Sequence, residues 1–316
     1  MTLPAEADDF DLYLNDLLID VIGDNRSRKY NFPGDTTALK TIIESVTNVD
    51  IDNATLQAAN RLLRVEAMVQ QRIEQLEQEV QKGILLQALV DYNDTKIFII
   101  IKAEHLDFIN ENDNRKAKGL PIKRKIFKSF CGYLDESLQP VYSMVSDSKK
   151  AISTYWWSGF LELVEEHSDS YNTQTAFDAF DNKIFNKIKK KYPEDYMYLR
   201  NSTIQYFRSK DEFVMEDYVT EIIHNYIPEN NELDILALEQ NILRLPDTAN
   251  FDRRFNIKRE ELKKRMIYKL KLTPQLVLEI KENIDWDSTV LAFEQNGIKY
   301  IQIRTEEGYK YFKKHN

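Results

Sequence analysis

The sequence predicts an α+β fold in which antiparallel hairpins and helices occupy separate stretches of the chain. Residues 84–102 contain two runs of aliphatic and aromatic residues on either side of Asn93-Asp94-Thr95, which is typical of a hairpin. Near the end of the chain, Asn296-Gly297 lies between alternating apolar residues and predicts a second hairpin within residues 276–304. Since strands and helices are grouped instead of alternating, we expect antiparallel sheets and not repeated βαβ units.

Helical spacing of apolar residues predicts a helical lead-in to the first hairpin and a helical lobe in the middle of the chain. The lead-in ends with a long amphipathic helix over residues 53–81. The middle lobe begins with helices over 153–166 and about 173–191, and Asn172 or Thr173 is placed to cap the second of these.

Four segments follow from this order of elements. We expect a helical or loop segment over 1–52, a helix with an antiparallel sheet over 53–150, a helical lobe over 151–248, and a basic segment with a hairpin over 249–316. In one arrangement the last hairpin joins the first sheet.

The composition is that of a folded chain from a reducing compartment. Hydrophobic residues make up 42% of the 316 residues and charged residues 30%, which provides for a core and a polar surface. The single cysteine, Cys131, excludes a disulfide within the chain. The acidic N-terminus lacks the pattern of a signal peptide, and the longest apolar run, residues 97–101, is far short of the roughly 20 residues that cross a bilayer. We therefore expect a cytoplasmic protein without membrane insertion.

Several segments whose apolar residues are typical of a protein core follow one another in a particular order over about residues 55–305. They are Arg61-Leu62-Leu63, the runs 83–90 and 96–102, Ala151 to Trp157 with Phe160-Leu161, Asn172-Thr173, Phe255-Asn256-Ile257, and Tyr300-Ile301-Gln302-Ile303. This order resembles the 37-kDa nucleoid-associated protein family of bacteria. The resemblance implies a non-catalytic, DNA-associated protein of the nucleoid. It also leaves an alternative, a protein-interaction or DNA-sensing component of a phage-defence or mobile-element system.

The sequence contains no motif that predicts a catalytic residue, a cofactor or a metal. The four histidines are scattered, no glycine-rich phosphate loop is present, and no Gly-x-Ser-x-Gly elbow occurs. Carboxylate pairs such as Glu165-Glu166 are typical of a solvated acidic surface. A metal-dependent nuclease built from scattered acids stays the enzymatic alternative.

The predicted DNA contacts are local, because a net charge of −9 disfavours phosphate binding over the whole surface. Three basic clusters are candidates for contacts with the phosphate backbone, without readout of bases. The first is a predicted loop marked by Gly119 and Pro121, the second lies on the middle helix, and the third precedes the last hairpin. Their residues are Arg115, Lys116, Lys118, Lys123, Arg124, Lys125 and Lys128; Lys183, Lys187 and Lys190; and Arg253, Arg254 and Lys258.

Each cluster also has a structural interpretation. The loop could balance nearby acids such as Glu104, Asp107 and Asp113. Cations near a helix C-terminus stabilise the helix dipole, and the third cluster contains acids within pairing distance along a helix. A homodimer would double the DNA contacts of one chain, so we expect one, with a partner protein as the alternative. The adjacent Trp156 and Trp157 predict one core side chain and one at a domain or dimer interface.

Overall fold

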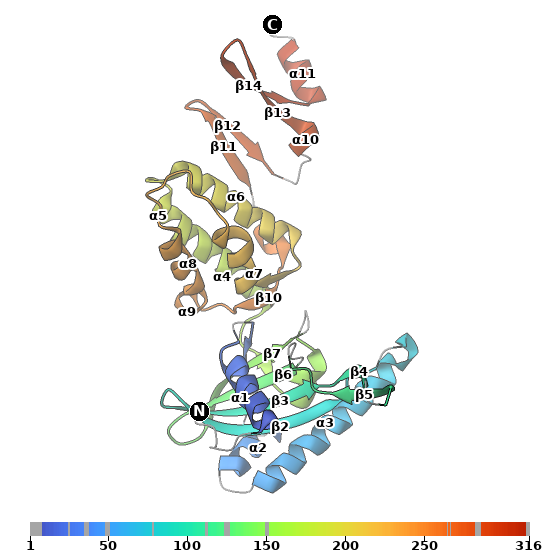
Figure 1. Ribbon diagram of the computed structural model, residues 1–316. Helices are drawn as coiled ribbons and strands as arrows, with labels where there is room; N and C mark the ends of the chain where they lie inside the picture. The colour runs from blue at the N-terminus through green and yellow to red at the C-terminus, as the bar shows by residue number, and fades with distance from the viewer. Residues whose placement is uncertain are drawn as a thin grey trace.

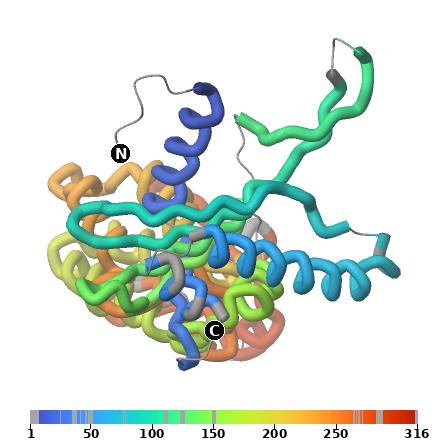
Figure 2. The backbone as a smooth tube through the Cα atoms, turned by 90° about the horizontal axis from the view of Figure 1, so that it is seen from below, coloured from blue at the N-terminus to red at the C-terminus, as the bar shows by residue number. Residues whose placement is uncertain are grey.

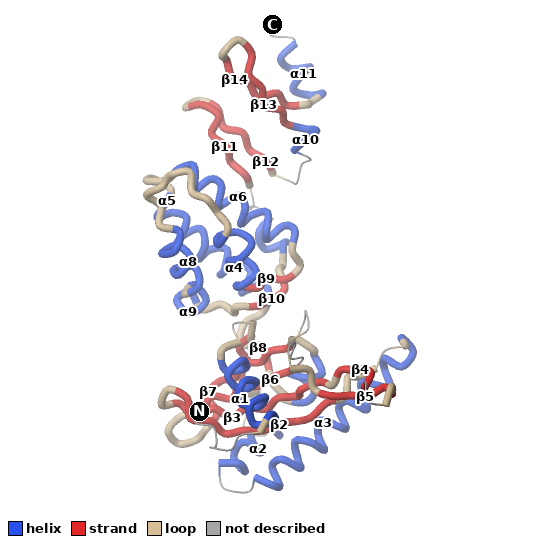
Figure 3. The backbone as a smooth tube through the Cα atoms, viewed as in Figure 1, coloured by secondary structure: helices blue, strands red, loops and turns tan. Residues whose placement is uncertain are grey.

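The computed structural model describes residues 8–24, 26–34, 38–47, 51–77, 79–110, 113–122, 127–148, 152–263, 265, 267–281 and 286–313. The predicted α+β fold is confirmed, and every strand pair among these residues is antiparallel. Figures 1 and 3 show a sheet with its helices, a helical lobe, and the hairpins near the C-terminus.

Among the described residues, the largest sheet has six strands. Their order is β2 (Gly83–Tyr92), β3 (Thr95–Glu104), β6 (Phe127–Leu134), β7 (Pro140–Asp147), β1 (Arg28–Asn31) and β8 (Val164–Glu165). The hairpin predicted over 84–102 is confirmed as β2–β3, and its turn residues Asn93 and Asp94 have φ of 46° and 62°. Of the helix predicted over 153–166, the π-helical segment η2 (Tyr155–Phe160) is present. The prediction is wrong for the residues after it, because the chain then enters the edge strand β8.

Helices cover both faces of this sheet. The alternation along β3 sends Phe98 and Ile100 to the face under α2 (Ala38–Thr47) and α3 (Ile51–Ile73), while Ile97 and Ile99 face α1 (Asp9–Ile22). Figure 2 shows α1 and α3 on opposite sides of the strands. The helix predicted over 53–81 is shorter, because a 3-10 turn, η1 (Glu74–Leu76), follows α3.

A second hairpin projects from the end of β3. Its strands are β4 (Leu106–Asn110) and β5 (Arg115–Gly119), and Figure 2 shows it extending away from the sheet. The prediction of a loop from residue 115 is therefore wrong for β5. The turn before β5 contains Asn114 with φ of 54°, a conformation that asparagine tolerates well.

The helical lobe has an aromatic core built around Phe180, Phe207, Phe213 and Tyr218. Its small sheet pairs β9 (Glu212–Val214) with β10 (Arg254–Asn256). Its helical elements are α4 (Asp169–Ala179), η3 (Phe180–Phe185), α5 (Asn186–Ile188), α6 (Pro193–Ser209), α7 (Met215–Tyr218), η4 (Val219–His224), α8 (Ile235–Leu243) and α9 (Leu245–Ala249).

The helix predicted over 173–191 begins earlier than expected. Ser168 is the N-cap of α4 and accepts the backbone N–H of Tyr171. Asn172 and Thr173, the predicted caps, are buried inside the helix, so this prediction is wrong. Asn172 instead donates to Asp252, and Thr173 accepts the backbone N–H of Lys258.

The C-terminal elements form two further hairpins. The elements of this part of the chain are η5 (Arg259–Leu262), β11 (Tyr268–Thr273), β12 (Leu276–Ile280), α10 (Trp286–Thr289), β13 (Val290–Gln295), β14 (Ile298–Ile303) and α11 (Glu306–Lys313). Asn296 and Gly297 have φ of 53° and 76°, as the predicted turn requires. Among the described strands, β11 pairs with β12 and β13 with β14, so neither hairpin joins the six-stranded sheet.

The sheet and the helical lobe are joined by buried polar contacts. Arg28 of β1 forms ion pairs with Asp169 at 3.0 Å and Asp252 at 3.2 Å. Trp156 is core, as predicted for one of the tryptophans, and donates to the carbonyl of Ser129. Trp157 packs on Tyr30 beside the small cavity between these two parts.

Candidate nucleic-acid interface

The first predicted cluster is largely neutralised where the structure describes it. Lys116 and Lys118 on β5 lie 2.8 and 3.7 Å from the carboxylate of Asp107 on the partner strand. The hydrogen bond from Lys116 lowers the pKa of Asp107. The interpretation that these lysines balance nearby acids therefore accounts for them. Arg115 is exposed on the same strand, while Lys123, Arg124 and Lys125 lie outside the described residues.

Lys128 is not a surface residue. Its side chain is 1% exposed, and its ammonium group lies 2.9 Å from Glu104 and 3.2 Å from Asp147. It also faces its cross-strand neighbour Lys102, which pairs with Glu66 of α3. Its prediction as a DNA contact is wrong, because β6 places Lys128 on the face that α3 covers. Lys128 lies two residues before the apolar Phe130, and residues two apart in a strand point to the same face of the sheet. This spacing was therefore a signal in the sequence that Lys128 is buried.

The third cluster also serves the fold. Arg254 is 4% exposed, bonds Glu212 at 2.8 Å, and donates to the backbone carbonyl of Asp147 across the junction with the sheet. Its prediction as a DNA contact is therefore wrong. Arg253 pairs with Asp247 at 2.9 Å, and the backbone N–H of Lys258 donates to Thr173. These residues do not form one exposed basic surface.

The second cluster keeps exposed cations. Lys183 donates to the carbonyl of Thr248 at 2.6 Å, which attaches it to α9. Lys187 and Lys190 are exposed at the end of α5, and no carboxylate among the described residues forms an ion pair with them. Lys189, between them in sequence, is likewise exposed and places its ammonium group 5.3 Å from the centroid of the Tyr196 ring.

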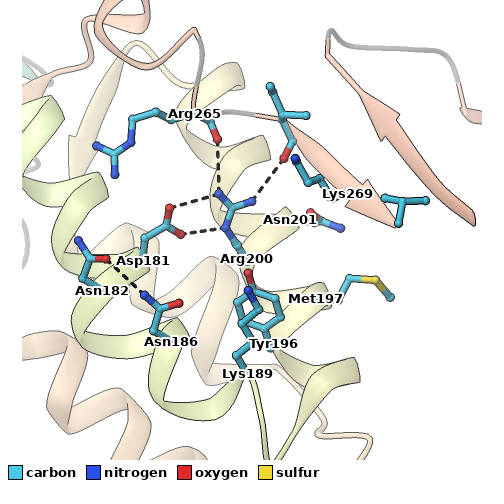
Figure 4. A pocket seen from close by; sticks show the side chains of 12 residues that line it. Asp181, Asn182, Asn186, Lys189, Tyr196, Met197, Arg200, Asn201, Arg265 and Lys269 are labelled. Atoms are coloured by element: carbon cyan, nitrogen blue, oxygen red, sulfur yellow. Dashed lines mark hydrogen bonds and ion pairs between the residues drawn. The ribbon is translucent and has the colours of Figure 1, made fainter. Parts of the chain in front are cut away.

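A cavity of about 590 Å³ opens beside these lysines. Figure 4 shows it between the η3–α5 helix, α6 and the base of the β11–β12 hairpin. Its lining contains four cations and one carboxylate, together with three asparagine amides, an aromatic ring and apolar side chains. These are Lys189, Arg200, Arg265 and Lys269; Asp181; Asn182, Asn186 and Asn201; and Tyr196, Met197, Ile267 and Val277.

Arg200 fixes the centre of the cavity wall. Its guanidinium binds both carboxylate oxygens of Asp181, at 2.9 and 3.2 Å, and donates to the carbonyls of Arg265 and Ile267. Figure 4 shows these bonds joining η3, α6 and the segment before β11 that contains Arg265. Bidentate pairs of this kind hold both side chains in one geometry.

The remaining cations of the lining differ in how far they are neutralised. Arg265 pairs with Asp178, and Lys269 lies 2.7 Å from Glu279, whose pKa it lowers. Lys189 has no ion pair with a described residue and rests over the ring of Tyr196. The cavity therefore presents one uncompensated ammonium group beside polar amides and an aromatic ring.

The sequence did not identify Lys189, Arg200 or Lys269 as site residues. The spacing of Asn182, Asn186 and Lys189 was an available signal, because residues four and three apart share one helix face. Arg200 and Lys269 are brought together by tertiary packing, and no local pattern indicates that.

The predicted acid pair and the cysteine can be placed in the part of the chain that the structure describes. There, no three His, Cys, Asp or Glu side chains are grouped in a way that could hold a metal ion. Glu165 is exposed, as predicted for a surface acid, and pairs with Arg28, while Glu166 is half-buried and pairs with Lys29. Burial raises the pKa of the Cys131 thiol to about 12.

None of the described helices is long and apolar enough to span a membrane. Compared with known proteins, the chain matches no family model and no curated sequence. The resemblance to the nucleoid-associated family over residues 55–305 therefore stays a prediction.

Proposed function

We propose that this chain is a non-catalytic, DNA-associated protein of the bacterial nucleoid that contacts phosphates through Lys187, Lys189 and Lys190. The observation that carries the proposal is the exposure of these three cations without ion pairs to described residues, in a chain of net charge −9. Uncompensated lysines release counterions when they neutralise phosphates, and this release drives non-specific DNA binding.

The acidic remainder of the chain sets the strength of this binding. Three phosphate contacts give a slope of log affinity against log salt of roughly 2.7 in magnitude. Repulsion between phosphates and the acidic surface lowers the affinity further. We therefore expect weak binding that disappears as salt rises, strengthened in a homodimer, where two copies contact one duplex.

Lys187 and Lys190 also lie where cations stabilise a helix end, so the experiment must separate the two roles. The test variant is Lys187→Gln with Lys190→Gln. Its control is Lys96→Gln with Lys299→Gln, which removes the same charge from β3 and β14. Binding to a random duplex is measured from about 50 to about 200 mM salt, where phosphate contacts have their largest effect.

The proposal expects the test variant to lose affinity at low salt and its salt slope to fall by about two, one for each lysine. The control variant keeps the slope of the parent chain. Unchanged affinity in the test variant, or no binding by the parent chain at low salt, contradicts the proposal. A lower melting temperature with unchanged DNA affinity assigns these lysines to helix stabilisation instead.

A protein-interaction component of a phage-defence system is the second candidate, and the β13–β14 hairpin favours it. Leu291, Phe293, Ile298 and Tyr300 share one face and are 42–56% exposed. Exposed apolar patches of this kind mark protein-interaction sites. Light scattering on the parent chain and on Phe293→Ser with Tyr300→Ser tests self-association. A dimer lost in the variant assigns the face to a second copy, and a monomeric parent chain excludes a second copy as its occupant.

A further inference from the structure

The cavity beside Lys189 has the size of a site for a small molecule or for one nucleotide. Its volume of about 590 Å³ lies within the ordinary range for such sites. The wall is already held in place, because Arg200 is bonded to Asp181 and to two backbone carbonyls. A ligand that enters this cavity therefore does not have to order the wall first.

The charge in the cavity fits a single phosphate better than a polyanion. Arg200, Arg265 and Lys269 are already paired with Asp181, Asp178 and Glu279. Lys189 is the lining cation that has no ion pair with a described residue. One ammonium group is sufficient for one phosphate, and Lys187 and Lys190 lie on the same helix end for the neighbouring phosphates of a strand.

The rest of the lining fits a nucleobase. The ring of Tyr196 and the thioether of Met197 provide apolar surface against which a planar base can stack. Asn186 donates one amide N–H to the side-chain oxygen of Asn182 at 3.3 Å, and the remaining N–H groups of these two residues and the amide of Asn201 provide both donors and acceptors at the lining. Donors and acceptors side by side match the edge of a base, and a bare phosphate would not use the acceptors.

We propose that this cavity binds one unpaired nucleotide, with its phosphate at Lys189 and its base against Tyr196 and the asparagine amides. For a nucleotide within a DNA strand, this inference rests on the proposed function, because Lys187 and Lys190 hold the rest of the strand. The same chemistry is present in a free nucleoside monophosphate, and the experiment separates the two sources. A paired base cannot enter, because its edge and faces are occupied within the duplex.

The experiment compares four labelled ligands by fluorescence anisotropy at low salt. They are an intact duplex, the same duplex with one unpaired nucleotide, that duplex with an abasic unit at the unpaired position, and a free nucleoside monophosphate. We expect the unpaired nucleotide to bind several-fold more tightly than the intact duplex. The abasic unit is expected to remove this preference, because it keeps the phosphate and lacks the base.

Variants of the lining assign the preference to the cavity. Tyr196→Ala and Asn186→Leu each remove the preference for the unpaired nucleotide and leave the salt slope on the intact duplex unchanged. Tyr196→Phe is the matched control and keeps the preference. Asn186 is exposed on the helix, so Asn186→Leu is expected to fold and still tests the cavity if Tyr196→Ala unfolds the lobe.

The failures of the two proposals are distinguishable. Intact-duplex binding with no preference for the unpaired nucleotide overturns the cavity inference and leaves the proposed function. Binding of the free nucleotide that is lost in Asn186→Leu, without binding of any DNA, overturns the proposed function and assigns the cavity to a free nucleotide. Binding of none of the four ligands overturns both.

Discussion

Two groups of lysines in this chain show how burial decides the role of a charge. Lys102 and Lys128 lie next to each other on the six-stranded sheet and are 3% and 1% exposed at their side chains. Each is bound to carboxylates, and both ammonium groups lie 5.9 Å from the ring of Tyr155. Lys187 and Lys190 on the helical lobe are exposed and have no ion pair with a described residue.

The comparison teaches that a count of basic residues does not locate a phosphate-binding surface. A buried ammonium group needs its carboxylates, because the cost of removing a charge from water is large. Such a lysine has no affinity left for DNA. An exposed lysine without a carboxylate costs the fold little and keeps its charge for a ligand.

The largest expected effect is on the buried side of this comparison. Lys128→Met removes the ammonium group shared by Glu104 and Asp147 and leaves two carboxylates in a region that water does not reach. We expect the free energy of unfolding in urea to fall by about 3–5 kcal/mol. Lys118→Met, which removes an exposed lysine paired with Asp107, is the control, and its expected loss is within about 1 kcal/mol.

A second substitution separates charge burial from loss of packing. Adding Glu104→Gln to Lys128→Met neutralises one of the buried carboxylates, so part of the lost stability should return. A double variant as unstable as the sum of the two single variants would show that packing, not charge, determines the loss.

The next effect concerns the junction between the sheet and the helical lobe. Arg254→Met removes the bonds to Glu212 and to the carbonyl of Asp147, and we expect a loss of about 1.5–3 kcal/mol. Arg253→Met is the matched control, because this neighbouring arginine is 22% exposed and its partner Asp247 is 70% exposed. Equal losses in the two variants, measured by urea unfolding, would contradict the assignment of Arg254 to the junction.

The parts of the fold that were predicted correctly are those with local causes. Asn93-Asp94 and Asn296-Gly297 adopt positive φ, and each turn together with its flanking apolar runs predicted its hairpin. Two of the strands that were missed, β1 and β8, are short and are defined by long-range pairing with β7 and with each other. No local pattern specifies such pairing.

The candidate site was predicted only in part, for the same reason. The basic helix end with Lys187 and Lys190 follows from helical spacing. The cavity needs Arg200 and Lys269, which lie on α6 and β11 and meet through packing of the hairpin on the lobe. The burial of Arg254 had no local signal, because a charged residue on a strand is predicted at the surface unless its partners are known. For Lys128 the spacing of two from Phe130 was the one available signal.

A smaller effect is expected on the exposed side of the comparison. Lys187→Gln and Lys190→Gln are expected to lower the free energy of unfolding by at most about 1 kcal/mol each, because cations in the last helical turn contribute no more than this. Urea unfolding at low and high salt checks the prediction, since this contribution is screened by salt. A loss of stability as large as that of Lys128→Met would show that Lys187 and Lys190 stabilise the fold as much as the buried lysine does. The distinction between buried and exposed lysines would then fail.

The smallest effect is a pH dependence at the β4–β5 hairpin. The pKa of Asp107 is lowered first by the hydrogen bond from Lys116, and Asp107 is exposed. A carboxyl group whose pKa is lowered in the folded state stabilises the fold above its unfolded pKa, and this contribution is lost as the pH falls through the folded value. Lys116→Ala should therefore raise the NMR titration midpoint of Asp107 toward the ordinary value for aspartate. Lys118→Ala should raise this midpoint less, because the ammonium group of Lys118 lies 3.7 Å from the carboxylate and that of Lys116 lies 2.8 Å from it. An unchanged midpoint in Lys116→Ala would mean that the pair does not persist in solution. Lys116 would then be an exposed, uncompensated cation like Lys187, and the β4–β5 hairpin would become a second candidate for phosphate contact.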